Sequence, residues 1–182
     1  MKIKKIISNV AKILGLDDVV ELVENRASIK TIQENVNYSL LLRCTSLIVA
    51  NISANFVQNV TMQSFDATDG VINLSEFSQP VQSIKQVVVN GRVVDHWLYH
   101  DKLVVPKGYV IVYFTFVPKI ETGEEKVLKS LPNQVLEYGI LAEYAFVSGM
   151  FNEGKVWNEK FLEMMFGIKN RTGVAVKMPI SF

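Results

Sequence analysis

The chain has 182 residues, of which 49% are hydrophobic and 20% charged, and its formal net charge is +1. This length and composition fit a globular protein made of one domain, or of a core with one inserted subdomain. The near-zero net charge excludes a strong overall field directed at nucleic acid or acidic lipid. No apolar run reaches the roughly 18 residues that a membrane-spanning helix requires.

The first fourteen residues combine a basic start with the pattern of an amphipathic helix. Asn9 and Lys12 interrupt the apolar region and no small-residue cleavage site follows, so we expect no secretory signal. Two interpretations of this helix remain open: it lies on a membrane surface, or it docks on its own domain or on a neighbouring subunit, which we favour. Its apolar face carries Ile3, Ile6, Ile7, Val10, Ile13 and Leu14.

Two further helices are expected before residue 60. The first runs from Asp17 to Val23 and begins with acidic residues, which suit a helix N-terminus. The second runs from Ser28, a candidate cap, to about Phe56, with a broad apolar face. Cys44 is the single cysteine of the chain, and within this face it is predicted to be a small buried hydrophobic residue. A lone cysteine allows no disulfide within the chain, which fits a reducing compartment.

The pattern then changes to that of a small antiparallel β subdomain. Short strands are expected at 71–74, 84–89, 93–98 and 103–105, and a long one at 109–117. The pair Asn90-Gly91 is a strong hairpin signal because both residues tolerate positive φ. Both faces of 109–117 are apolar, so this strand should be central in a sheet or sandwiched. The charged segment 119–129 is predicted to be a solvated connector.

Two helices follow Pro132, which suits a helix start. The first carries a wide apolar stripe from Val135 to Val147. We expect a break around Gly149 and Gly154, and a second helix from about Lys155 to Ile168. The economical arrangement packs these helices against the one from Ser28 to Phe56, which makes the β segment an insertion.

Histidine is the only residue type whose spacing suggests a metal or acid–base site. His96 and His100 lie four residues apart, which on a helix would bring them together. In a strand they stand about 13 Å apart, so we predict a turn with exposed imidazoles instead. No cluster of nucleophile and base, no phosphate-binding loop and no cysteine motif is present in the sequence, and we expect neither an enzyme nor a bound cofactor or metal.

The C-terminal residues alternate between apolar and other side chains after a breaker at 170–173. A strand of this kind is too short to form its own sheet, and Pro179 suits only an edge strand. It either augments the sheet of a partner or joins this chain's own β subdomain, and the pattern does not decide between them. Burial of five apolar side chains at roughly 1.5–3 kcal/mol each nearly cancels the cost of ordering about ten residues. One arm alone would therefore bind weakly, and a ring of arms firmly.

Together these expectations give an α+β fold: an antiparallel helical core of long helices, an inserted small antiparallel β subdomain and an extended C-terminal arm. The expected parts are N-terminal helices at 1–60, the β subdomain at 61–121, C-terminal helices at 122–169 and the arm at 170–182.

This layout resembles that of the head-to-tail adaptor (connector) proteins of tailed bacteriophages, especially short-tailed phages. The resemblance covers nearly the whole chain and depends on the order of its parts. These include a VxVNGxxV hairpin, an LxVPxGxVxVY stretch, an LPxxxxEYxxxAEYAF helix, the WNEKFLEMM helix and the terminal arm. The lysine-rich first helix matches no element of the family.

The resemblance implies a non-enzymatic structural protein of the virion neck, assembled in the host cytoplasm. Such proteins form a homo-oligomeric ring, typically a dodecamer, beneath the portal protein, and they extend the channel through which double-stranded DNA is ejected. A tail or nozzle protein docks on the ring, no membrane is expected as a partner, and a near-neutral charge lets DNA slide.

The family's C-terminal segment commonly contacts the portal. The resemblance therefore places portal contact on 171–182, with these candidate residues: Arg171, Val174, Val176, Met178, Ile180 and Phe182. Candidate subunit or tail contacts are Trp97, Trp157, Phe161 and Met165. Apolar surface in excess of what one molecule can bury would serve the two faces that a ring subunit presents to its neighbours.

Two other hypotheses remain. The chain could be another phage morphogenesis ring, such as a tail terminator or head-completion protein, which would bind the ends of tail tubes and not the portal. It could also be a membrane-surface accessory protein that acts through residues 1–14.

Overall fold

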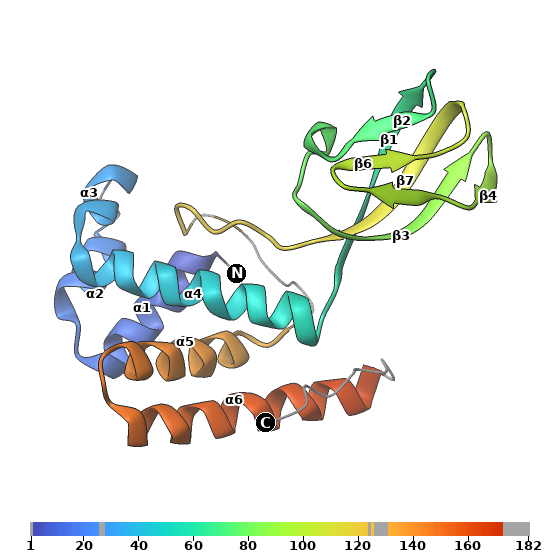
Figure 1. The fold of residues 1–182 in the computed structure, drawn as a ribbon. Coiled ribbons are helices and arrows are strands. Elements are labelled where there is room, and N and C mark those ends of the chain that lie inside the picture. Colours follow the sequence, from blue (N-terminus) through green and yellow to red (C-terminus); the bar gives the residue numbers. More distant parts are fainter. Residues whose placement is uncertain (1, 26–27, 124, 126–130, 173–182) are drawn as a thin grey trace. The chain divides into compact units, whose positions relative to one another are not determined.

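The structure is a computed structural model that describes residues 2–25, 28–123, 125 and 131–172. The fold is mixed α+β, with two antiparallel sheets (Figure 1). The chain divides into two compact units, Met1–Phe56 with Lys119–Phe182, and Val57–Pro118. The predicted insertion at 61–121 thus corresponds to a second unit with somewhat different limits.

The helices of the first unit pack side by side. They are α1 (Ile3–Leu14), α2 (Asp17–Glu24), α3 (Ile29–Glu34), α4 (Val36–Asn55), α5 (Asn133–Val147) and α6 (Phe151–Thr172). Helix α5 contacts α1, α4 and α6, and Figure 1 shows it between α4 and α6. Apolar side chains therefore occur on more than one side of α5, because it is enclosed by several partners.

Glycines allow the neighbouring helices to approach closely. A Cβ at Gly139 in α5 would lie 2.7 Å from a methyl carbon of Ile48 in α4. A Cβ at Gly154 in α6 would lie 2.7 Å from the ring of Phe146 in α5. The predicted break at Gly154 is therefore wrong: the break lies at Gly149, which has φ +79°, and Gly154 is part of α6.

The helix predicted from Ser28 to Phe56 is also two helices. Ser28 caps α3 as expected, and its Oγ accepts a hydrogen bond from the Thr31 amide. Asn35 then leaves the helical conformation, and its side chain accepts from the Tyr38 amide at 2.9 Å, which starts α4. Because the Asn35 side chain accepts from a free backbone N–H at the start of α4, Asn35 ends α3 and begins α4. The prediction of one continuous helix from Ser28 to Phe56 is therefore wrong.

The connector after the second unit docks on helices in its described part. Lys4 and Ile3 donate backbone hydrogen bonds to the carbonyls of Gly123 and Glu125, and the Tyr38 hydroxyl donates to the carbonyl of Thr122. These bonds satisfy the N-terminus of α1. The prediction of a solvated connector is therefore wrong for Ile120, Thr122, Gly123 and Glu125, which are buried or half-buried, whereas Glu121 is exposed as predicted.

The second unit consists of two sheets. The larger has the strand order β1-β7-β3-β4, and the smaller the order β2-β6-β5. The strands are β1 (Asn59–Ala67), β2 (Val71–Asn73), β3 (Val81–Val89), β4 (Arg92–Val94), β5 (Trp97–Tyr99), β6 (Lys102–Val104) and β7 (Gly108–Phe116), with a short 3₁₀ helix, η1 (Leu74–Glu76). The single strand predicted at 93–98 is wrong: it is β4 and β5, which belong to different sheets.

The predicted hairpin and central strand are confirmed. Asn90 and Gly91 have φ of 49° and 81° and join β3 to β4, which are antiparallel. Strand β7 lies between β1 and β3. Its residues Val110, Val112 and Phe114 are fully buried on one face.

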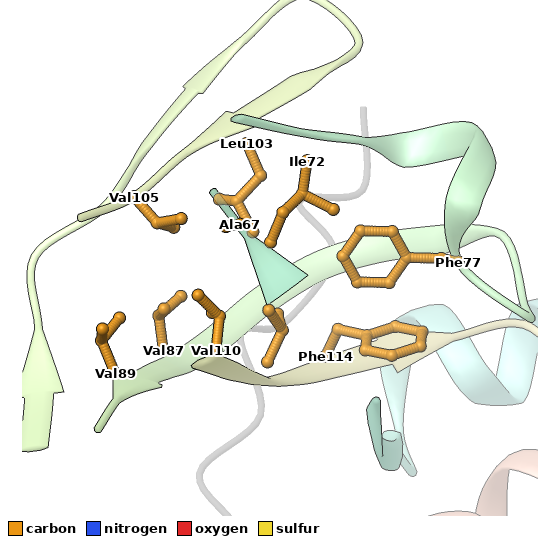
Figure 2. Close-up of a cluster of buried hydrophobic side chains, with 10 residues drawn as sticks. Ala67, Ile72, Phe77, Val87, Val89, Leu103, Val105, Val110 and Phe114 are labelled. Atoms are coloured by element: carbon orange, nitrogen blue, oxygen red, sulfur yellow. The ribbon is translucent and has the colours of Figure 1, made fainter. Parts of the chain in front are cut away.

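The core of this unit lies between the two sheets. Figure 2 shows side chains from both sheets meeting there, with Phe77 on the ring of Phe114 at 4.8 Å between centroids. The cluster consists of Ala67, Ile72, Phe77, Val87, Val89, Leu103, Val105, Val110, Val112 and Phe114.

Candidate interaction surfaces

Strand β5 presents three consecutive apolar side chains to solvent. Trp97, Leu98 and Tyr99 are 66%, 54% and 66% exposed. The strand is the last of its sheet and pairs with β6 through a tight turn in which His100 has φ 53°. Its neighbour β6 contributes Leu103 to the core, whereas all three residues of β5 stay outside it. Trp97, predicted to be a contact residue, therefore lies on an apolar strand at a sheet edge.

The larger sheet has a second apolar surface, on the face opposite the core. Alternate residues of a strand point to opposite faces. On the face of β7 opposite its buried set, Tyr109 is 56% exposed and Ile111 is half-buried. The same face of β1 carries Val60 and Met62, 56% and 63% exposed, which pair with Thr115 and Tyr113 of β7. An open hollow of about 340 Å³ lies there, lined by Met62, Gln63, Ser64, Tyr109 and Ile111. We call this surface the outer face.

The outer face depends on strand β1, which the sequence analysis did not predict. In the structure this strand, NVTMQSFDA, alternates between partly buried and exposed positions through all but its last residue. It was missed because polar residues occupy most positions, so the segment lacks the apolar density of the other strands.

Two of the predicted contact residues on α6 are in fact part of the core. Phe161 and Met165 are each 1% exposed, and the ring of Phe161 packs edge-on against Phe56 at 6.3 Å between centroids. The prediction that they contact a neighbouring subunit or the tail is therefore wrong, because α6 turns this side toward its own unit.

Trp157 lies on another side of α6 and is half-buried. Its ring stacks on Tyr138 of α5 at 5.6 Å, and the Lys160 ammonium lies 4.5 Å from its centroid. Cation and rings thus form a packed surface cluster across α5 and α6.

The predicted portal-binding arm is largely outside the described residues. Val174, Val176, Met178, Ile180 and Phe182 all lie there. Arg171 belongs to α6, which extends to Thr172, so the breaker predicted to begin at residue 170 is wrong.

The described residues contain no group of three or more histidine, cysteine, aspartate or glutamate side chains that could hold a metal ion. His100 lies in the turn between β5 and β6 and is exposed as predicted, whereas His96 is half-buried. Cys44 is buried, which confirms its prediction, and burial, with a smaller contribution from Glu143, raises the pKa of its thiol to about 11. A thiol of this kind is a poor nucleophile near neutral pH.

The N-terminal helix docks on its own unit. Most of the apolar face of α1 is buried, with Ile3, Ile7 and Val10 fully so, and only its C-terminal end, at Ile13, is exposed. Asn9 donates to Glu137 of α5 at 2.8 Å. This confirms the favoured interpretation of that helix. Within the described ranges, no helix combines the length and apolar character needed to cross a membrane.

Comparisons with known proteins do not extend this description. The chain matches no protein-family model, and no curated protein matches it either. The exposed strand β5, the outer face and the pattern of the terminal residues are therefore the features of the chain that bear on its function.

Proposed function

We propose that this chain is a structural subunit of the ring that joins the head to the tail in a tailed bacteriophage. The ring docks under the portal, extends the DNA channel and provides the surface to which the tail attaches. The observation that carries the proposal is the apolar surface of the second unit, where β5 and the outer face expose large side chains that a solitary subunit leaves in water. A ring subunit needs two different contact faces, one for each neighbour.

The contact residues of this proposal are partly revised by the geometry. Trp97 remains a candidate for subunit or tail contact, and Leu98 and Tyr99 join it because they are exposed on the same strand. Trp157 stays a candidate through its exposed portion, whereas Phe161 and Met165 do not. Portal contact is proposed for 171–182, where apolar residues alternate up to Phe182.

A structural role also agrees with the charge of the chain. Nineteen basic and eighteen acidic residues nearly cancel. Tight binding to a DNA backbone relies on many lysine and arginine contacts to phosphates. A channel wall that DNA must pass has no use for such contacts, so double-stranded DNA is proposed as a passing partner that is not recognised by sequence.

The proposal is tested by mixing the purified chain with the portal ring of the same phage and following co-sedimentation. We expect the full-length chain to sediment with the portal. A variant that lacks 173–182 should unfold at the same temperature as the full-length chain and stay in the supernatant. If the full-length chain fails to bind, or if the truncated variant binds equally well, the proposal is wrong.

The same experiment, with tail tubes in place of the portal, distinguishes the proposal from its main alternative. A tail terminator or head-completion ring would sediment with tail tubes and leave the portal alone. A membrane-surface role through residues 1–14 is not favoured, because most of the apolar face that such a helix would insert is buried against its own unit.

A further inference from the structure

Strand β1 has one edge that no strand occupies in the described part of the chain. It is the first strand in the order β1-β7-β3-β4, so β7 pairs with one edge only. All nine of its residues, Asn59–Ala67, are in register with β7. A fully paired outer strand of this length is a ready template for one more strand.

The direction of the backbone groups of β1 follows from one hydrogen bond in the neighbouring hairpin. The Asn90 amide donates to the Tyr109 carbonyl at 3.1 Å, so Tyr109 directs its backbone groups toward the β3–β4 side. Successive residues alternate in antiparallel pairing, so Val110 and Val112 direct theirs toward β1. Their partners there are Phe65 and Gln63.

The other set of β1 residues therefore directs its N–H and C=O groups to the open edge. This set is Val60, Met62, Ser64 and Asp66. Its side chains belong to the outer face, where Val60 and Met62 are more than half exposed. A strand that pairs with this edge must place its bonded residues opposite this set, with their side chains on the outer face.

The last nine residues of the chain have the pattern that such a strand requires. Val174, Val176, Met178, Ile180 and Phe182 form one alternating set, and every member has an N–H. The other set contains Pro179, which has none. If the apolar set is bonded to β1, its five side chains extend the outer face beside Val60 and Met62. Pro179 then belongs to the set whose backbone groups are directed away from the sheet, where its lack of an N–H costs no hydrogen bond. Both features therefore select the same orientation.

We propose that residues 174–182 of one copy pair with the open edge of β1 in a second copy. The inference rests on the proposed function, because a ring places a second copy of the chain next to each subunit. Each copy has one such edge and one such segment, so the contact is heterologous and can continue from copy to copy until a ring closes. The same residues cannot pair with β1 and contact a portal at once, so portal binding releases this contact.

The test uses the full-length protein and synthetic peptides of residues 173–182, without a portal. One peptide carries an N-methyl group on Val176 and the matched control carries it on Ala175, so each lacks one N–H and keeps all side chains. We expect the unmodified peptide and the Ala175-methylated peptide to reduce self-association in sedimentation velocity. The Val176-methylated peptide should compete about tenfold less well, as the loss of one hydrogen bond implies. Equal competition by the two methylated peptides would overturn the proposal.

Residue-resolved amide exchange gives a second readout. As the protein concentration rises, the amides of Met62 and Ser64 should become protected, while those of Gln63 and Phe65 are protected throughout by β7. Protection of Met62 and Ser64 that does not depend on concentration would mean that the segment pairs within its own chain, which overturns the proposal. Absence of protection at every concentration overturns it too.

A pair of substitutions checks the location. Met62→Lys, on the outer face, should weaken self-association, whereas Val93→Lys, equally an exposed apolar residue but on β4 at the other edge of the sheet, should leave it unchanged. The reverse result would place the contact on β4 and contradict the proposal. None of these measurements involves a portal. The proposed pairing with β1 can therefore fail while the proposed function stands, and the proposed function can fail while the pairing is confirmed.

Discussion

At the scale of single residues, two glycines decide how the helices of the first unit pack. From the sequence, Gly154 is predicted to break a helix, because glycine lowers helix propensity, and Gly139 has no predicted role. The structure places both inside helices, where a Cβ would meet Ile48 or Phe146. Both contacts are made between different helices, so the spacing of residues within one helix could not predict them.

Substitution of these glycines should therefore cost stability. Gly139→Ala places a Cβ 2.7 Å from Ile48, and overpacking of this kind costs about 1–3 kcal/mol, which outweighs the gain in helix propensity. Gly167→Ala is the matched control, because nothing lies within 4 Å of its Cβ and the change should stabilise α6 by up to about 1 kcal/mol. Urea unfolding of both variants measures the difference, and equal effects would contradict the close packing of α4 and α5.

Glu125 stabilises the loop that docks on α1. Its Oε1 accepts from the Glu121 amide at 3.1 Å and from the amide and hydroxyl of Thr122, each at 3.0 Å. Burial, the largest single effect, raises the pKa of this carboxyl. The hydrogen bonds to its charged form lower the pKa, and their combined effect exceeds that of burial, so the pKa lies below its ordinary value of 4.5. The ionised form is thus favoured by folding.

This shift predicts how stability depends on pH. Because the folded pKa is lowered, the stabilisation is complete above about pH 4.5 and is lost as the pH falls through the folded pKa. Glu125→Gln should lose about 1–2 kcal/mol at neutral pH and should lose less on acidification than the wild type. Glu163→Gln, an exposed position on α6, is the control and should change stability by no more than about 0.5 kcal/mol. Parallel pH profiles for wild type and Glu125→Gln would refute this role.

At the scale of elements, strong local signals in the sequence were sufficient to predict a strand or a turn, and weak signals were not. The Asn90-Gly91 hairpin and strand β7 were predictable, because turn chemistry and a run of apolar residues identify them. Strand β1 was missed because tertiary pairing with β7 makes a strand of a mostly polar sequence. The division at Asn35 was missed because the apolar periodicity continues across it, while a capping side chain ends the helix.

Helix α1 allows a direct comparison within one element. Ile7 is fully buried, whereas Ile13 is 54% exposed. Ile7→Ala should cost about 2–5 kcal/mol, and Ile13→Ala no more than about 0.5 kcal/mol, in chemical unfolding. If both variants were equally mild, α1 would not dock as described, and a role at a membrane surface would become the better explanation of its apolar face.

At the scale of the whole molecule, hydrophobic periodicity and turn signals predicted a mixed α+β protein with a separate β unit, but not its surfaces. The sequence shows that apolar residues are abundant, and it does not show which are covered. Phe161 and Met165 turned out to be core residues, whereas Val60, Met62 and the three residues of β5 stay exposed. Periodicity gives the face of an element, but which faces find partners depends on the tertiary arrangement.

The central proposal is that these exposed surfaces belong to the subunit of a neck ring. Electron microscopy of the full-length chain mixed with the portal ring of the same phage tests it most directly. The account predicts portal particles with an additional coaxial ring of this chain on the tail-facing side. Portal rings that remain bare at a saturating concentration of folded chain would contradict it.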